Sequence, residues 1–282
     1  MAQSAGFCYG VKRAVETTKK IKSENASKKV WVLGELIHNS HVIKELDEMG
    51  IMTVDVLPEN ETGICVVRSH GMAPQKIKEI TDKGFEVVDL TCLDVKKVQQ
   101  KAIQLAQEDF LVLILGKPEH PEVIAIKANA QMYSENVFVV QDLKTIKELT
   151  DKIKSHKRVG VVIQTTQKIE LLEEIIAYLL PISSELKVFN TICKSTTMRQ
   201  QEARELAKTS DLMVVVGGKN SANTTHLAEI LKEITETIHI ETADDLDEFK
   251  NLIEKSENIG VTAGASTPEN IIKNVIEKIE KI

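Results

Sequence analysis

The chain has 282 residues, four cysteines and a net charge of −6, which argues against a general nucleic-acid or anionic-membrane surface. No run of ~18 apolar residues is present, and the first residues lack the charged and apolar regions of a signal peptide. We therefore expect a cytoplasmic protein without nucleic-acid or membrane partners, whose cysteines serve a metal or catalysis and not a disulfide framework.

Three similar segments follow one another along the chain, and each passes from a short apolar run to a helix-like stretch with a cysteine at the junction. They are GFCYGVKRAVETTKKI from Gly6, LTCLDVKKVQQKAIQLA from Leu90 and TICKSTTMRQQEARELA from Thr191. The register continues beyond each cysteine, because the apolar runs VWVLG, LVLILG and LMVVVG follow at nearly the same distance. Such periodicity predicts three related structural units.

Each unit is expected to be an open α/β lobe, because short β-branched runs alternate with amphipathic segments. Crossovers of helical length favour parallel strands, whose carboxyl ends carry the loops with the chemistry. Although the length alone would suggest about two domains at ~150 residues each, the repeat predicts three pseudo-threefold-related lobes in a trefoil-like arrangement. Their expected ranges are 1–91, 92–192 and 193–282.

One cysteine begins the predicted helix of each lobe: Cys8, Cys92 and Cys193. If an approximate threefold axis relates the lobes, the three thiolates meet around it and can bind three corners of a cuboidal iron-sulfur cluster. Helix N-termini favour thiolates and offset the negative charge of a cluster. With three protein ligands one iron stays open and can act as a Lewis acid. The predicted centre of the fold is therefore an iron-sulfur site.

Zinc bound by three cysteines and one histidine is the alternative by ligand type. The fourth cysteine, Cys65, has no counterpart in the other repeats and lies inside an apolar run. We expect it in the hydrophobic core, where free cysteine is common.

Polar loops at the ends of the predicted strands offer imidazoles, hydroxyls and an amide, with hardly an arginine or lysine among them. Together with helix N-termini, these groups can surround the oxygens of a small anion such as a phosphate. The histidines outside these loops, His41, His156, His226 and His239, are expected to be structural. The predicted anion-binding residues are His38, His70, His120, Ser221, Asn223 and Ser266.

Glu122 is the one carboxylate that stands in such a loop beside a predicted donor. A carboxylic acid near a partly desolvated substrate can have a raised pKa and deliver a proton. Thr165 and Thr166 could orient this acid or a substrate hydroxyl by hydrogen bonding. Alternatively, the two threonines merely cap the helix that follows them.

These residues stand in motifs that resemble the 4-hydroxy-3-methylbut-2-enyl diphosphate reductase family, which catalyses the last step of the methylerythritol phosphate route to isoprenoids. The resemblance covers essentially the whole chain, and the motifs occur in the order of the family. The matching stretches are GFCYGVKRA, IHNSHVIKEL, SHG, DLTC, HPEV, QTT, the segment IC...T..RQ, GGKNSANT and GVTAGAS.

The resemblance implies a three-lobed α/β fold and one 4Fe-4S cluster with three cysteine ligands, Cys8, Cys92 and Cys193, and an open substrate-binding iron. The implied reaction is the reductive dehydroxylation of an allylic diphosphate to isopentenyl and dimethylallyl diphosphate by two electrons, supplied by ferredoxin or flavodoxin. Glu122 would be the proton source, working with Thr165 or Thr166. The six loop residues would bind diphosphate: His38, His70, His120, Ser221, Asn223 and Ser266.

Four positions depart from the commoner pattern of the family. Tyr9 and Leu93 follow the first and second cysteines, where the family has a smaller residue and a proline. Ala222 replaces a serine that would add a hydroxyl contact to diphosphate. Glu119 replaces a glycine before His120 and would be unfavourable if its charge pointed toward the diphosphate.

Two other functions fit the same pattern of cysteines. A quinolinate synthase-like cluster dehydratase also joins three lobes around a cluster held by three cysteines, but its dicarboxylate substrate calls for a different anion pocket. A non-catalytic metal-binding or electron-transfer protein would normally ligate its cluster fully. The missing fourth cysteine ligand argues against the electron carrier.

Overall fold

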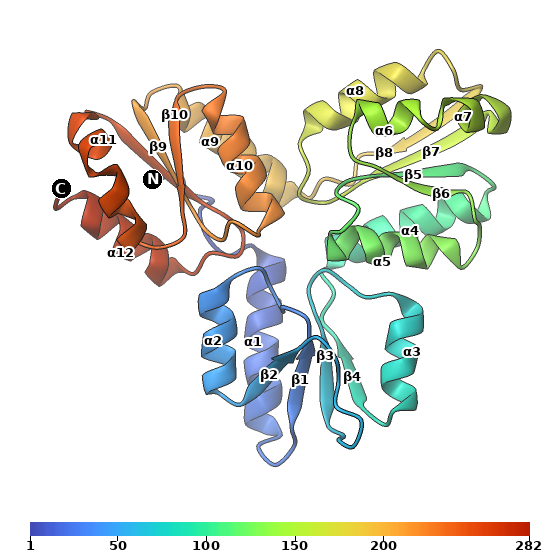
Figure 1. Ribbon diagram of the computed structural model, residues 1–282, viewed down its shortest axis with the longest axis horizontal. Helices are drawn as coiled ribbons and strands as arrows, with labels where there is room; N and C mark the ends of the chain where they lie inside the picture. The colour runs from blue at the N-terminus through green and yellow to red at the C-terminus, as the bar shows by residue number, and fades with distance from the viewer.

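The computed structural model describes residues 1–282 and shows three α/β lobes arranged around a common centre (Figure 1). Each lobe contains one sheet in which all strand pairs are parallel. The α/β class and the three-lobed arrangement predicted from the repeat are confirmed. None of the helices combines the length and apolar character that a membrane crossing requires.

The first lobe has four strands in the order β2-β1-β3-β4. Val30 and Val32 pack beneath α1 and α2, whereas Trp31 and Leu33 pack with α3 on the opposite face. Because both faces are covered, β1 and β3 are buried along their whole length and are continuous apolar runs. The elements are α1 Tyr9–Glu24, β1 Val30–Leu33, α2 Ser40–Glu48, β2 Ile51–Val54, β3 Ile64–Val67, α3 Pro74–Asp82 and β4 Glu86–Asp89.

The second lobe repeats this plan with the order β6-β5-β7-β8. Its central strand β5 is fully buried, with Val112 and Ile114 facing α4 and α5 and Leu113 facing α8. The elements are α4 Leu93–Gln107, β5 Leu111–Leu115, α5 Pro121–Gln131, β6 Val137–Val140, α6 Leu143–Lys147, α7 Thr150–His156, β7 Arg158–Ile163, α8 Ile169–Leu179 and β8 Glu185–Phe189.

The third lobe has three strands, in the order β10-β9-β11. The amino terminus lies beside β11, where the Ala2 N–H donates to the Val261 carbonyl at 2.9 Å. The elements are α9 Lys194–Ala207, β9 Leu212–Val216, α10 Ala222–Lys232, β10 Glu236–Ile240, the 3-10 helix η1 Asp244–Phe249, α11 Lys250–Lys255, β11 Ile259–Ala263 and α12 Glu269–Ile279.

The segments that precede the cysteines occupy equivalent places in the three sheets. In the first two lobes an edge strand, β4 or β8, comes directly before the next cysteine, and in the third lobe the first residues of the chain lie at the matching edge. Each cysteine therefore follows a segment that belongs to the sheet of another lobe: the third lobe for Cys8, the first for Cys92 and the second for Cys193. The division at 1–91, 92–192 and 193–282 stays a prediction.

Candidate functional site

The three cysteines lie at equivalent positions and line one cavity at the centre of the molecule. Each is the N-cap of a helix: Cys8 for α1, Cys92 for α4 and Cys193 for α9. The backbone N–H of each cysteine donates to a carbonyl in the polar loop of another lobe. These bonds are Cys8 to the Ala265 carbonyl (3.1 Å), Cys92 to Ser69 (2.9 Å) and Cys193 to Thr165 (3.1 Å).

Two of the sulfur atoms are held by the backbone of the helix that follows. Cys8 Sγ accepts from the Val11 N–H at 3.5 Å and Cys193 Sγ from the Thr196 N–H at 3.4 Å. Burial raises the pKa of both thiols, while these hydrogen bonds oppose the rise. Donors directed at sulfur favour the thiolate, which is the form that binds metal.

Close approach of the sulfurs depends on Gly10, in the first turn of α1. A Cβ at this position would lie 2.7 Å from Cys92 Sγ and 3.9 Å from Cys8 Sγ. The first is far inside van der Waals contact, so any side chain here would push the second cysteine away from the first. A glycine at this point leaves the cysteines room to converge on one metal group.

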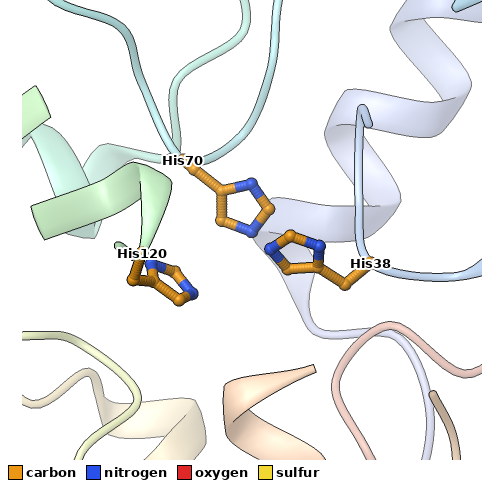
Figure 2. A group of neighbouring side chains, drawn as sticks. All are labelled: His38, His70 and His120. Carbon is orange, nitrogen blue, oxygen red and sulfur yellow. The ribbon is translucent and has the colours of Figure 1, made fainter. Parts of the chain in front are cut away.

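Three imidazole rings form a cluster (Figure 2), and they line the same cavity as the cysteines. His38 lies in the loop after β1, His70 in the loop after β3, and His120 at the N-cap of α5. The rings of His38 and His70 are stacked with centroids 4.5 Å apart, and the ring of His120 lies edge-on to them at 5.7 and 5.5 Å. One nitrogen from each ring lies within 4.8 Å of the others, which is close enough to hold a metal ion.

The hydrogen bonds of His120 favour an anion over a metal at this cluster. Its Nδ1 accepts the Glu122 N–H at 3.1 Å, so its Nε2 carries the hydrogen and can only donate. His38 donates through Nδ1 to Glu35 at 2.8 Å. Burial lowers the pKa of His120 to about 3 and that of His70 well below its usual value, with the neighbouring histidines contributing.

Several buried polar atoms around the histidines have no partner within the protein. They are Nε2 of His38, Nδ1 of His70 and Nδ2 of Asn223. Unpaired buried polar atoms cost free energy, and their presence in one cavity indicates a polar ligand. Ser221 and Asn223, at the start of α10, and Ser266 are buried and line the same cavity, and Ser266 Oγ donates to the His38 carbonyl at 3.1 Å.

Glu122 points into the cavity from the first turn of α5 and is only 1 % exposed. Thr165 donates to both of its oxygens, through the backbone N–H at 2.7 Å and through Oγ1 at 2.8 Å. Burial raises the pKa of Glu122 to about 7, although the bonds from Thr165 lower it. A carboxyl group with a pKa near neutrality can donate a proton at physiological pH.

The two threonines differ in their contacts. Thr166 lines the cavity but accepts through Oγ1 from Gln164 at 3.1 Å, and it makes no hydrogen bond to Glu122. The helix that follows, α8, has Lys168 as its N-cap, and no side chain caps it. The alternative that the threonines merely cap this helix is wrong, because the helix begins beyond them.

Cys65, Glu119 and the four other histidines lie outside the cavity. Cys65 is fully buried in β3, in the core of the first lobe, as predicted. Glu119 is exposed and does not line the cavity, so its charge points to solvent. None of the four histidines expected to be structural lines the cavity; they are His41, His156, His226 and His239.

Sequence reasoning missed Thr196, which lines the cavity and is buried. Its Oγ1 lies 3.2 Å from Cys193 Sγ, and its N–H also donates to that sulfur. The signal was its place three residues after the helix-capping cysteine, because the N–H at this position faces the N-cap side chain. Asp94 and Tyr9 were also missed as a pair: the Tyr9 hydroxyl donates to Asp94 at 2.7 Å and lies 3.7 Å from Cys92 Sγ.

The chain is similar to known proteins over its whole length. The family model described as LytB protein matches residues 1–280. Two curated relatives are named 4-hydroxy-3-methylbut-2-enyl diphosphate reductase. The relative from Citrifermentans bemidjiense is 42 % identical, with 100 % of this chain and 96 % of the relative covered. The relative from Aquifex aeolicus is 38 % identical with the same coverage.

Two solved structures share the fold. One is described as (E)-4-hydroxy-3-methyl-but-2-enyl diphosphate reductase, the terminal enzyme of the non-mevalonate pathway. It is 37 % identical, with a TM-score of 0.73 over 100 % of this chain and 98 % of the other. The second is the E-1-hydroxy-2-methyl-but-2-enyl-4-diphosphate reductase from Plasmodium falciparum, which is 25 % identical with a TM-score of 0.86 over 97 % and 85 %. The likeness extends over all three lobes.

Proposed function

Because this chain belongs to the LytB protein family, we propose that it is a 4-hydroxy-3-methylbut-2-enyl diphosphate reductase. It is an oxidoreductase that removes the allylic hydroxyl of this diphosphate and forms isopentenyl and dimethylallyl diphosphate. The observation that carries the proposal is one cavity lined by a cysteine from each lobe, the histidine cluster and the buried Glu122. Family membership does not favour the dehydratase or the non-catalytic alternative.

Cys8, Cys92 and Cys193 would hold one 4Fe-4S cluster. Their equivalent positions, the N–H donors directed at two of the sulfurs and the clearance left by Gly10 all fit such a group. When bound, a cluster with three protein ligands supplies electrons and an open iron that can act as a Lewis acid. We assign the supply of electrons to ferredoxin or flavodoxin and the site of action to the cytoplasm.

The histidine cluster and the start of α10 would bind the diphosphate. His120 presents an Nε2–H, Asn223 an unpaired Nδ2, and the N–H groups at the beginning of α10 add the positive end of a helix. Ser221 and Ser266 add hydroxyl groups. These donors are neutral, and they would be paired by phosphate oxygens that remove their desolvation cost.

Glu122 would supply the proton that lets the hydroxyl leave as water. The allylic C–O bond breaks, two electrons enter, one proton goes to the leaving oxygen and a second proton forms a C–H bond at either end of the allyl unit. Thr165 holds both oxygens of Glu122 and so sets the direction of the acid. Burial of this carboxyl raises its pKa to about 7, so a protonated fraction is present near neutral pH.

Anaerobic purification followed by iron and sulfide analysis, Mössbauer spectroscopy and a reductive assay tests the proposal. We expect a cluster with one iron site that differs from the other three and two-electron reduction of the hydroxylated diphosphate. Zinc without sulfide would refute the cluster. Turnover of a dicarboxylate in place of the diphosphate would support the dehydratase instead.

A further inference from the structure

Arg199 is a buried cation on α9, in the helix that Cys193 begins, and it is only 2 % exposed. Its guanidinium group reaches the segment that leads into Cys8. Nη2 donates to the Ser4 carbonyl at 2.7 Å and to the Gly6 carbonyl at 2.8 Å, and Nε donates to the Ser4 carbonyl at 3.1 Å. These bonds tie the backbone before one cysteine to the helix that follows another.

The charge of Arg199 has no carboxylate partner among its hydrogen bonds, which go to carbonyl groups and, at 3.3 Å, to the Ser195 hydroxyl. A buried guanidinium without a counter-charge is costly. Burial lowers the pKa of Arg199, and the charges that oppose this are, in order, those of Cys8, Cys193 and Glu202. The hydrogen bonds of this cation join the segment two residues before Cys8 to the helix that Cys193 begins, so Arg199 lies between the segments that carry these two thiols.

Glu202 lies one turn further along α9 and binds the same segment through its N–H groups, whereas Arg199 binds the carbonyl groups. Its carboxylate accepts from the N–H of Gln3 and, at 2.8 Å, from the N–H of Ser4. Glu202 thus shares the structural task of fixing the amino terminus but brings no positive charge. It offers a control in which the same segment loses its fixation while the change in charge has the opposite sign.

A second arginine makes a related contact before Cys92. Arg13, on α1, donates to the Leu90 carbonyl at 3.2 Å and to the Thr91 carbonyl at 2.6 Å. The equivalent helix of the second lobe, α4, contains no arginine. The segment before Cys193 is held instead by Thr191, whose hydroxyl accepts a hydrogen bond from the Ile163 N–H of β7 at 2.9 Å. An arginine thus holds the approach to two of the three cysteines, and Arg199 is the one that is buried.

We propose that Arg199 is a positioning residue for the iron-sulfur cluster, which fixes the backbone leading into Cys8 and compensates the negative charge of the Cys8 and Cys193 thiolates. This inference rests on the cluster of the proposed function. Hydrogen bonds and charges around a cluster set its reduction potential and its retention of metal. Loss of a buried positive charge disfavours the reduced, more negative state of the cluster.

The test compares Arg199→Gln, Arg199→Lys and Glu202→Ala with the wild-type protein after anaerobic reconstitution. The readouts are the midpoint potential of the cluster, the rate of iron release to a chelator and the melting temperature of the cluster-free protein. We expect Arg199→Gln to shift the potential to more negative values and to release iron ~10-fold faster, as loss of partners around a metal site commonly does. Arg199→Lys keeps the charge and should keep the potential while releasing iron faster than wild type.

Glu202→Ala should lower the melting temperature, and because it removes a negative charge, any change in potential should be toward less negative values, opposite in sign to that of Arg199→Gln. Wild-type potential and iron release in Arg199→Gln would overturn the proposal, as would the same changes in Glu202→Ala. If Arg199→Gln does not fold, wild-type iron release in Arg199→Lys overturns it. A wild-type protein that binds no iron and sulfide would refute the proposed function and this inference together, whereas a loaded wild type with unaffected variants refutes the inference alone.

Discussion

Thr165 donates a hydrogen bond to each oxygen of the buried Glu122 carboxyl group, one from its backbone and one from its side chain. Glu122 lies in the first turn of α5, and Thr165 lies in the loop after β7 of the same lobe. The loop after one strand therefore fixes a carboxyl group at the start of a neighbouring helix. This pair separates the acid from solvent and directs it into the cavity. We therefore expect replacement of the Glu122 carboxyl group to affect proton delivery and not cluster or substrate binding.

Glu122→Gln should keep the cluster and the binding of the diphosphate, because the amide has nearly the same shape. It cannot donate an acidic proton, so we expect kcat to fall by ~100-fold or more, within the range of general acid catalysis. Steady-state kinetics measures the fall, and Mössbauer spectroscopy with substrate added checks the cluster. Full activity in this variant would remove Glu122 from the mechanism.

Thr165→Val should move the pH dependence of kcat. The hydroxyl of Thr165 stabilises the charged form of Glu122 and lowers its pKa against the effect of burial. Without this bond the pKa rises, and because the acid acts while protonated, the alkaline limb of the kcat profile should move to higher pH.

Thr166→Val is the matched comparison, since Thr166 makes no hydrogen bond to Glu122 and its replacement should leave that limb in place. A shift to lower pH in the Thr165→Val profile, or equal shifts in both variants, would contradict the assignment.

Asn223→Asp should weaken binding of the diphosphate. It replaces the unpaired Nδ2 donor by a carboxylate oxygen of the same size, which repels phosphate and cannot donate. We expect KM to rise at least ~10-fold, since a hydrogen bond to a charged group contributes ~1.5–3 kcal/mol. Asn251→Asp adds the same charge on the exposed surface of α11 and controls for net charge. Equal KM values in the two variants would exclude Asn223 from the anion site.

Gly10→Ala should separate cluster binding from stability of the protein fold. The new Cβ would lie 2.7 Å from Cys92 Sγ, so iron content after reconstitution should fall well below the wild-type level. Alanine is a better helix former than glycine by up to ~1 kcal/mol, which offsets part of this clash, so the cluster-free protein should lose far less stability than the loaded protein. Iron analysis and thermal unfolding measure the two effects. Full iron content would show that the cysteines do not need this clearance.

Much of the fold followed from local patterns that need no knowledge of distant contacts. The apolar runs, their spacing and the repeated cysteine–helix junction depend on periodicity and on burial of both sheet faces, which the sequence expresses directly. Cys8, Cys92 and Cys193 could be singled out because each recurs at the same place in the repeat. Equivalence in the repeat predicted that they converge, and they line one cavity.

Only the tertiary structure decided which side chains form hydrogen bonds with one another in the site. Sequence could not distinguish Thr165 from Thr166, because adjacent residues differ in the direction of their side chains and only one direction reaches Glu122. Nor could it foresee Arg199, whose bonds join residues almost two hundred positions apart. Local sequence determines which elements form and where polar groups stand along them, whereas burial and long-range packing decide which of these groups meet and what charge each one carries.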